Sequence, residues 1–355
     1  MKRLLVALLF MQMLSAYETV FILHDASEAQ ALSPVIDVYL RNHEDICVLA
    51  GGSASEILAG KPHILSFDQL GITEKIDKTW NQESLLSSES IQIILEKLPA
   101  KRVISGVAYE FYGQLLEAYA SSITFAYWDN INYEGDESLS PPKMIEVAQH
   151  LLISSKPPTT LHPQEHIVGQ PCLERQQIYE LDPSKIRAQL PFPLKSPILV
   201  FFGGYGRAYN KALSQFLTAA EGLSEYTILL LPHPRTEGAI ERRKLSHRML
   251  PHVHLIEPTW NITSTEAALL ANHVVCHPTI AGIHAAVAEK NVIYWTPPGL
   301  THTNLLTESG APQIGTLAEL KTHLTAPQTP PRDIFEILQA PRNSTRLIYE
   351  TLHAE

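Results

Sequence analysis

The sequence predicts an α/β protein with two domains of the same kind, followed by a helical tail. Short apolar segments rich in Val, Ile, Leu and Phe alternate along the chain with segments of helical periodicity. The alternation stops in a proline-rich stretch and then begins again. Strands that are apolar on both faces are typical of parallel sheets covered by crossover helices. A length of 355 residues also favours two domains, since about 100–200 residues per domain is usual.

The composition excludes several classes of protein. Hydrophobic residues make up 45% of the chain and charged residues 18%, as in ordered globular proteins. The net charge is −10 and no run of Lys or Arg stands out, so we expect no nucleic-acid partner. Three widely spaced cysteines (Cys47, Cys172 and Cys276) indicate no disulfide framework, and no Cys or His spacing indicates a metal site.

The first sixteen residues have the pattern of a targeting segment. Lys2 and Arg3 precede the apolar run Leu4–Leu14, and the small residues Ser15 and Ala16 follow it. We expect residues 1–16 to be a signal or membrane-targeting segment, because the apolar run is too short to span a bilayer. An extra strand or a misassigned start of translation is the alternative. Cleavage would indicate a periplasmic or secreted protein, whereas a transferase would be cytoplasmic or associated with the inner membrane.

We expect the first domain to span residues 17–165. Its predicted strands are 19–23, 45–50, 63–67, 102–106 and 123–127. Its predicted helices are 33–43, 91–98, 109–120 and 144–152. Each strand is a short apolar run bounded by polar residues or glycine, and the order of strands and helices indicates a parallel sheet.

A change in composition separates the two domains. Residues 166–195 are predicted to be the linker, because proline and polar residues are frequent there. The second domain is expected at 196–330, with strands at 197–202, 226–231, 253–257, 273–277 and 291–295. Residues 331–355 are predicted to form a C-terminal helix.

The second domain has candidate ligand-binding residues where its predicted strands end. Ligands bind outside the carboxyl ends of the strands in open α/β sheets. There the backbone of a glycine turn before a helix can approach a phosphate, and histidine or arginine can donate hydrogen bonds to it. An ordinary strand-to-helix turn and surface histidines are the alternative. The candidate ligand-binding residues are Gly203, Gly204, Gly206, His233, Arg235, His277, Thr279 and His284.

The first domain has candidate catalytic and binding residues in the corresponding loops. His24, Asp25 and Glu28 follow the first strand, where a carboxylate or an imidazole can act as a base. Helix capping by Asp25 and Glu28 is the alternative. A second loop offers aromatic and carboxylate groups to a ligand, namely Trp128, Asp129 and Glu134. A solvated polar loop is the alternative.

Several segments together resemble the GT-B architecture of glycosyltransferases, in which two Rossmann-like domains face each other across a cleft. The segment IVGQPCLER (167–175) resembles the joint before the second domain in lipid-A-disaccharide synthase and UDP-N-acetylglucosamine 2-epimerase relatives. FFGGYGRAYNKAL (201–213) resembles the glycine loop of MurG-like transferases, and LLPHPR (230–235) resembles the His-Pro motif of bacterial sialyltransferase-like and capsule-polymer transferases. The resemblance implies that the candidate ligand-binding residues of the second domain bind a nucleotide-sugar donor. It also implies that Trp128, Asp129 and Glu134 of the first domain bind the acceptor.

One position departs from the pattern of these families. Their donor segment reads S-x-x-x-x-E-A-x-x-x-G-x-P, and its Glu binds the ribose hydroxyls. Here Thr279 lies near the Ser position and His284 at the Glu position, while Glu289 and Asn291 replace the Gly and Pro. An imidazole can hydrogen-bond a hydroxyl but is not a bidentate acceptor. The departure leaves open an unusual or a degenerate donor site.

The first interpretation is therefore a metal-independent glycosyltransferase of bacterial envelope polysaccharide. We expect a nucleotide sugar as substrate, no separate cofactor, a glycan or lipid acceptor, and a peripheral contact with a membrane. A sugar-nucleotide 2-epimerase, an exported two-domain protein that binds a small ligand, and an inactive GT-B relative are the alternatives.

Overall fold

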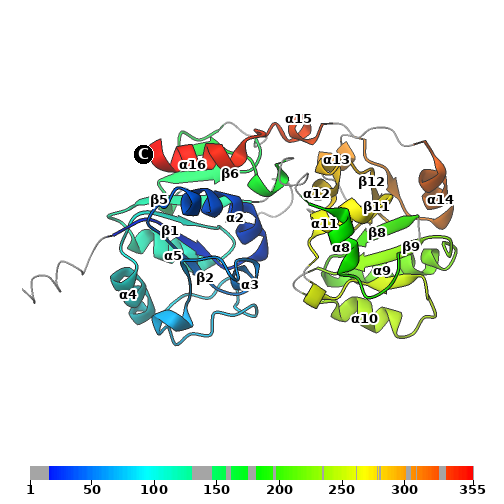
Figure 1. Ribbon diagram of the computed structural model, residues 1–355, viewed down its shortest axis with the longest axis horizontal. Coiled ribbons are helices and arrows are strands. Elements are labelled where there is room, and N and C mark those ends of the chain that lie inside the picture. The colour runs from blue at the N-terminus through cyan, green and yellow to red at the C-terminus, as the bar shows by residue number, and fades with distance from the viewer. Residues whose placement is uncertain are drawn as a thin grey trace, which may run out of the picture. The chain divides into compact units, whose positions relative to one another are not determined.

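The computed structural model describes residues 16–129, 146–156, 161–174, 181–194, 197–233, 236–260, 262–277, 279, 281–300, 305–308, 310–327 and 333–354. The chain forms two compact units, and it passes between them after Cys172 and again after Gln339. Unit 1 therefore contains the first half of the chain together with the C-terminal residues, and unit 2 contains the segment between (Figure 1). Residues 1–15, where the targeting segment was expected, lie outside the described residues.

Unit 1 is built on a seven-stranded parallel sheet with the strand order β3-β2-β1-β4-β5-β6-β7. The register between β1 and β4 places Phe21 opposite Ile104 and Ile22 opposite Ser105. The strands are β1 (Tyr17–Leu23), β2 (Ile46–Ala50), β3 (Ile64–Ser66), β4 (Ala100–Ser105), β5 (Ile123–Trp128), β6 (His150–Ile153) and β7 (Glu165–Ile167).

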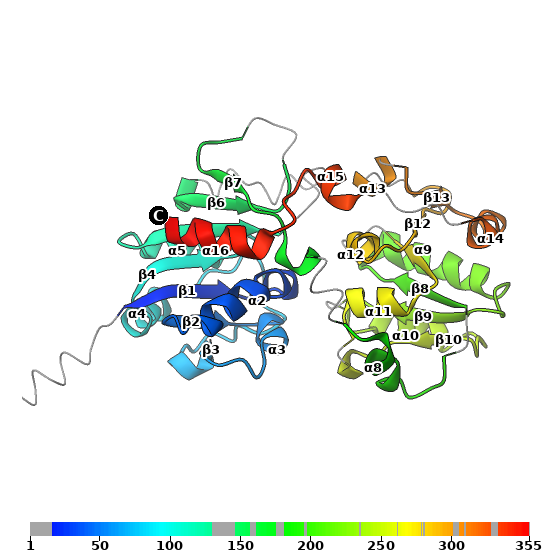
Figure 2. The same cartoon turned by 45° about the horizontal axis from the view of Figure 1, so that its top comes forward.

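Helices cover both faces of this sheet, because its central strands are apolar on both sides. One face packs against α4 and α5, and the other against α2, α3 and α16 (Figures 1 and 2). The helices are α2 (Ala26–Arg41), α3 (Ala54–Ile57), α4 (Ser88–Lys97), α5 (Glu110–Ala118) and α16 (Ser344–Ala354), and the short 3₁₀ turn η1 is Asp68–Leu70.

The end of unit 1 differs from the sequence prediction in two places. The helix predicted at 144–152 was wrong over its last residues, because His150–Ile153 is strand β6 and pairs in parallel with β5. The buried run Leu151–Ile153 extends the sheet. The expected linker at 166–195 also contains regular elements: Glu165–Ile167 is the edge strand β7, and the 3₁₀ turn η3 (Pro171–Leu173) follows it.

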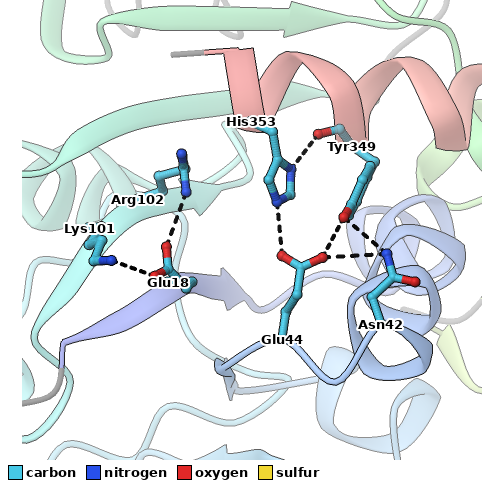
Figure 3. A network of polar contacts seen from close by, with 7 residues as sticks. All are labelled: Glu18, Asn42, Glu44, Lys101, Arg102, Tyr349 and His353. Atoms are coloured by element: carbon cyan, nitrogen blue, oxygen red, sulfur yellow. Dashed lines mark hydrogen bonds and ion pairs between the residues drawn. The ribbon is translucent and has the colours of Figure 1, made fainter.

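The C-terminal helix α16 belongs to unit 1, in contact with α2. Ile348 and Leu352 are fully buried in the core of unit 1. Figure 3 shows how Glu44 holds the helix: its carboxylate accepts hydrogen bonds from Tyr349 at 2.5 Å and from His353 Nε2 at 2.8 Å. Residues 331–355 therefore do not form one terminal helix, because α15 (Ile334–Leu338) belongs to unit 2.

Unit 2 repeats the same architecture with a six-stranded parallel sheet in the order β10-β9-β8-β11-β12-β13. Leu199, Phe201 and Val275 of this sheet pack against Tyr209 and Phe216 of α9. The strands are β8 (Ile198–Phe202), β9 (Thr227–Leu231), β10 (Val253–Leu255), β11 (His273–Cys276), β12 (Val292–Trp295) and β13 (Gln313–Ile314).

The helices of unit 2 include α8, which lies within the expected linker and packs against α11. They are α8 (Pro183–Ala188), α9 (Gly206–Ala220), α10 (Ala239–Leu245), α11 (Ser264–Leu270), α12 (Ala281–Val287), α13 (Leu305–Glu308), α14 (Leu317–Thr325) and α15, with the 3₁₀ turn η5 (Pro258–Trp260). Among all described residues, no helix is both long enough and apolar enough to cross a membrane.

Candidate functional site

Each sheet has one point where the strand order reverses, and several of the candidate residues follow the strands beside it. In unit 1 the reversal lies between β1 and β4, and in unit 2 it lies between β8 and β11. Connections from adjacent strands leave in opposite directions at such a point and open a crevice at their carboxyl ends. In unit 2 the glycine turn follows β8 and His277 follows β11, so both lie at this edge.

The glycine turn of unit 2 leads directly into helix α9. The Gly203 amide donates to the Leu231 carbonyl at 2.8 Å, which fixes the turn to β9. Gly206 begins the helix with φ +82°, a conformation that favours glycine. Tyr205 is the N-cap residue and its side chain makes no capping hydrogen bond. The first amides of this 15-residue helix are therefore not capped by that side chain, and the helix dipole is positive there.

Two histidines lie beside this turn. The His233 ring packs edge-on against Tyr205, with 4.8 Å between ring centroids, and the His277 ring lies 5.8 Å from that of Tyr209. Tyr205 itself is 56% exposed. The structure thus brings together the turn and both histidines, because they follow the three adjacent strands β8, β9 and β11. In the sequence, Gly203 and His277 are 74 residues apart. Arg235 lies outside the described residues.

The remaining two predicted donor-binding residues, Thr279 and His284, make hydrogen bonds at the first turns of helices. The Thr279 hydroxyl accepts from the Ala281 amide at 3.4 Å, at the start of α12. His284 is buried, and its Nδ1 lies 3.1 Å from the Thr265 hydroxyl of α11. Burial lowers the pKa of His284 to about 4, so its imidazole is neutral at pH 7. His284 therefore joins α12 to the first turn of α11, as a residue facing the domain interior does.

A buried pair that the sequence analysis missed lies beneath the glycine turn. Glu241 of α10 is fully buried, and its Oε1 accepts a hydrogen bond from the Tyr209 hydroxyl. Burial raises the pKa of Glu241 above its usual value, and it raises that of Tyr209 as well. A buried carboxyl needs a donor nearby, but that donor stands 32 residues away in the sequence. No local pattern marks the pair.

In unit 1, Asp25 and Glu28 form a capping box at the start of α2. Asp25 accepts from the Ala26 amide at 2.6 Å, and Glu28 Oε2 accepts from the Asp25 amide at 3.4 Å. Glu28 is fully buried, and its Oε2 also accepts from the Tyr112 hydroxyl at 2.5 Å. A Cβ on Gly106 would lie 1.8 Å from Glu28 Oε1, so only glycine fits there.

The charge state of Glu28 follows from this environment. Burial, together with the nearby carboxyls of Asp129 and Asp25, raises the pKa of Glu28 well above its usual value. Its Oε1 has no hydrogen-bond partner within the described part of the chain. Glu28 is therefore held mainly in its neutral form.

His24, the third predicted catalytic residue, is packed into the interior of unit 1. Its side chain is 2% exposed, and a Cβ on Gly52 would lie 2.5 Å from the ring. Its Nε2 donates to the Asp77 carbonyl at 3.0 Å. Burial lowers its pKa, so the ring is neutral. His24 thus supports the loop, and of the three candidates only Asp25 is partly exposed.

The predicted acceptor-binding residues differ in position. Trp128 is buried in the core below the edge of the sheet, whereas Asp129, the next residue, is half-buried at the carboxyl end of β5. Burial raises the pKa of Asp129 to about 6, and a hydrogen bond from Ser27 offsets part of this rise. The charge of Asp25 also raises the pKa of Asp129, and the charge of Asp129 in turn raises the pKa of Glu28. Glu134 lies outside the described residues.

Among the described residues, the side chains of His, Cys, Asp and Glu form no group of three or more that could hold a metal ion. The arrangement instead offers two kinds of chemistry. Unit 1 presents carboxyl groups whose pKa values are raised, and unit 2 presents backbone amides and imidazoles that suit an anion.

Two parallel sheets of this strand order, each covered by helices on both faces, define a GT-B-type fold. No family model and no curated protein matches the sequence. Solved structures match over nearly the whole chain. The UDP-GlcNAc 2-epimerase from Neisseria meningitidis, bound to UDP-GlcNAc, aligns with a TM-score of 0.63 and 14% identity over 95% of this chain and 100% of that chain.

Two further structures that match are a MurG protein and a polymerase. MurG from Acinetobacter baumannii aligns with a TM-score of 0.53 and 12% identity, over 95% of this chain and 100% of that chain. The wall teichoic acid polymerase TagF, solved with CDPG, aligns with a TM-score of 0.60 and 10% identity over 95% and 88%. At these identities the likeness shows the fold, and the predicted α/β class and GT-B resemblance are confirmed.

Proposed function

We propose that the protein is a GT-B glycosyltransferase that binds a nucleotide sugar through unit 2 and transfers the sugar to a glycan or lipid acceptor. The observation that supports it best is the convergence of the glycine turn, the start of α9 and two histidines at one edge of the unit 2 sheet. Backbone amides at a helix start favour phosphate. His233 and His277 can donate further hydrogen bonds to its oxygens.

In this proposal the leaving diphosphate needs no cation, because the amides, the helix dipole and the imidazoles offset its charge. Activity should therefore persist in excess EDTA. Loss of activity that added Mg²⁺ restores would contradict this part of the proposal.

Unit 1 supplies the base in the proposal. Glycosyl transfer requires a group that takes the proton of the acceptor hydroxyl, and a base works best when its pKa lies near the working pH. Asp129 suits this role better than Glu28, because it is half-buried where Glu28 is fully enclosed, and its pKa is about 6. Asp25 then raises the pKa of Asp129 through its charge.

The first experiment measures thermal unfolding of a protein lacking residues 1–16 with UDP, GDP and CMP. A ligand at about 100 times its Kd adds about 2.7 kcal/mol to the free energy of unfolding. We expect one nucleotide to raise the Tm, and His233→Ala to abolish the rise. His247→Ala, at an exposed histidine of the same unit, is the matched control. No rise with any nucleotide would contradict the proposal.

Epimerisation of a sugar nucleotide is the second candidate. The neighbouring carboxyl groups of Asp25, Glu28 and Asp129 in unit 1 favour this reaction too. Inversion of the configuration at a sugar carbon requires that a proton be removed from it and returned to it. Incubation with UDP-GlcNAc in D₂O separates the two reactions by NMR. Deuterium at C2 of the sugar, without transfer to any acceptor, would indicate the epimerase.

A further inference from the structure

A buried carboxyl group lies directly behind the glycine turn of unit 2. A Cβ placed on Gly203 would lie 3.1 Å from Glu241 Oε1 and 3.0 Å from the Tyr209 hydroxyl. The carboxyl and the hydroxyl are therefore in contact with the backbone of the turn. The second oxygen, Glu241 Oε2, has no hydrogen-bond partner among the residues that the structure describes.

An ionised carboxylate at this place would oppose an anion at the turn. The electrostatic repulsion between two negative charges at short range is strong there, because the protein interior screens charges poorly. The neutral acid has no such effect and still occupies the space behind Gly203. Full burial of Glu241 favours the neutral acid.

We infer that Glu241 is a positioning residue that supports the glycine turn in its protonated form, so that binding of a diphosphate at the turn takes up a proton. The inference rests on the proposed function, because it takes the anion to be the diphosphate of a nucleotide. Tyr209 orients the carboxyl by donating to Oε1, and Gly203 leaves room for both groups.

Other charged or titratable groups surround this pair. Arg242, the next residue on α10, pairs with Glu257 and attracts the ionised form of Glu241. His233 and His277 adjoin the turn from the ends of β9 and β11, and histidine is the side chain whose ordinary pKa lies within this pH range. The pH dependence of anion binding therefore has two sources, which substitutions at Glu241 and at the histidines separate.

The experiment is calorimetric titration with UDP, and in parallel with inorganic pyrophosphate, between pH 5 and 9 in buffers of different ionisation enthalpy. We expect the affinity of the unaltered protein to fall roughly 10- to 100-fold as Glu241 ionises. Glu241→Gln should lose this fall and take up less proton per ligand bound, by up to about one. Glu225→Gln, at an exposed residue of the same unit, should behave as the unaltered protein.

A second variant tests the hydrogen bond. The Tyr209 hydroxyl lowers the pKa of Glu241, so Tyr209→Phe should move the midpoint of the affinity loss to higher pH. If Glu241 had a purely structural role, Glu241→Gln would bind UDP more weakly at every pH and would take up as many protons per ligand as the unaltered protein.

The outcomes distinguish this inference from the function on which it rests. UDP binding with equal proton uptake by Glu241→Gln and the unaltered protein overturns the inference alone. Failure of both UDP and pyrophosphate to bind at any pH overturns the inference and the anion site of the proposed function together. If His233→Gln and His277→Gln together remove the whole pH dependence, Glu241 is likewise excluded.

Discussion

The hydroxyl of Tyr112 donates a 2.5 Å hydrogen bond to the buried carboxyl of Glu28, across the point where the unit 1 sheet reverses its strand order. Tyr209 and Glu241 form a similar pair in unit 2. In each unit a glycine backbone packs against the carboxyl: Gly106 in the first and Gly203 in the second. Both halves therefore place a buried acid and a tyrosine behind the edge that the proposal assigns to function.

The first prediction concerns stability and pH. Because the folded pKa of Glu28 is raised, the protein loses stability as pH rises from about 4.5, the unfolded value, through the folded pKa. The loss is at most roughly 1.4 kcal/mol per pH unit for one group. Glu28→Gln, which keeps the capping box, should lose less stability between pH 5 and 8 in denaturant unfolding. Glu89→Gln, at an exposed position of α4, is the control; equal slopes for both variants would refute the prediction.

The second prediction concerns the proposed base. Since Asp129 must be ionised to take a proton, kcat/KM should rise with pH around its pKa of about 6 and then level off. Asp129→Asn should lower kcat/KM by roughly 10²- to 10⁴-fold while nucleotide binding to unit 2 stays unchanged. Steady-state kinetics between pH 4.5 and 8 check this. A rate that does not depend on pH across this range would remove Asp129 from the role.

The third prediction compares two adjacent glycines. A Cβ on Gly203 would lie 2.9 Å from the Leu231 carbonyl, so Gly203→Ala should destabilise unit 2 by about 1–3 kcal/mol. A Cβ on Gly204 would meet its nearest neighbours at 3.4 Å, which is an ordinary contact. Gly204→Ala should therefore fold normally but weaken UDP binding, because the methyl group keeps a phosphate from the backbone. Thermal unfolding with and without UDP separates the two effects; unimpaired UDP binding by Gly204→Ala would contradict close approach.

The fourth prediction concerns the C-terminal helix. Gly169 has φ +78°, and its Cβ would lie 2.2 Å from the Ser344 hydroxyl and 3.0 Å from the Pro341 carbonyl. Gly169→Ala should cost about 2–4 kcal/mol, through the strained backbone and the displaced segment before α16. Gly71→Ala also has a positive φ but open space around it, and so it measures the backbone strain alone. The difference in Tm between the two variants reports the packing of α16, and equal values would argue against it.

Alternating apolar runs and helical segments were enough to predict two parallel sheets, because both faces of each central strand are buried and the apolar run shows this locally. The glycine turn and His233 were likewise predictable, since they stand directly after strongly apolar strands. Residues 144–152 were misread because Leu151–Ile153 fits both a helix and a strand, and only pairing with β5 decides between them.

The sequence by itself determined the α/β class, the two halves and the strand ends at which polar groups stand. Only the tertiary structure decided the state and surroundings of those groups. His24 and Glu28 became buried and neutral, His284 joined two helices, and Asp129 kept some exposure. The physical reason is that burial and electrostatic neighbours come from contacts between distant segments, such as Tyr112 with Glu28 at a separation of 84 residues. The periodicity of the sequence predicts local secondary structure, but it does not predict contacts between distant segments.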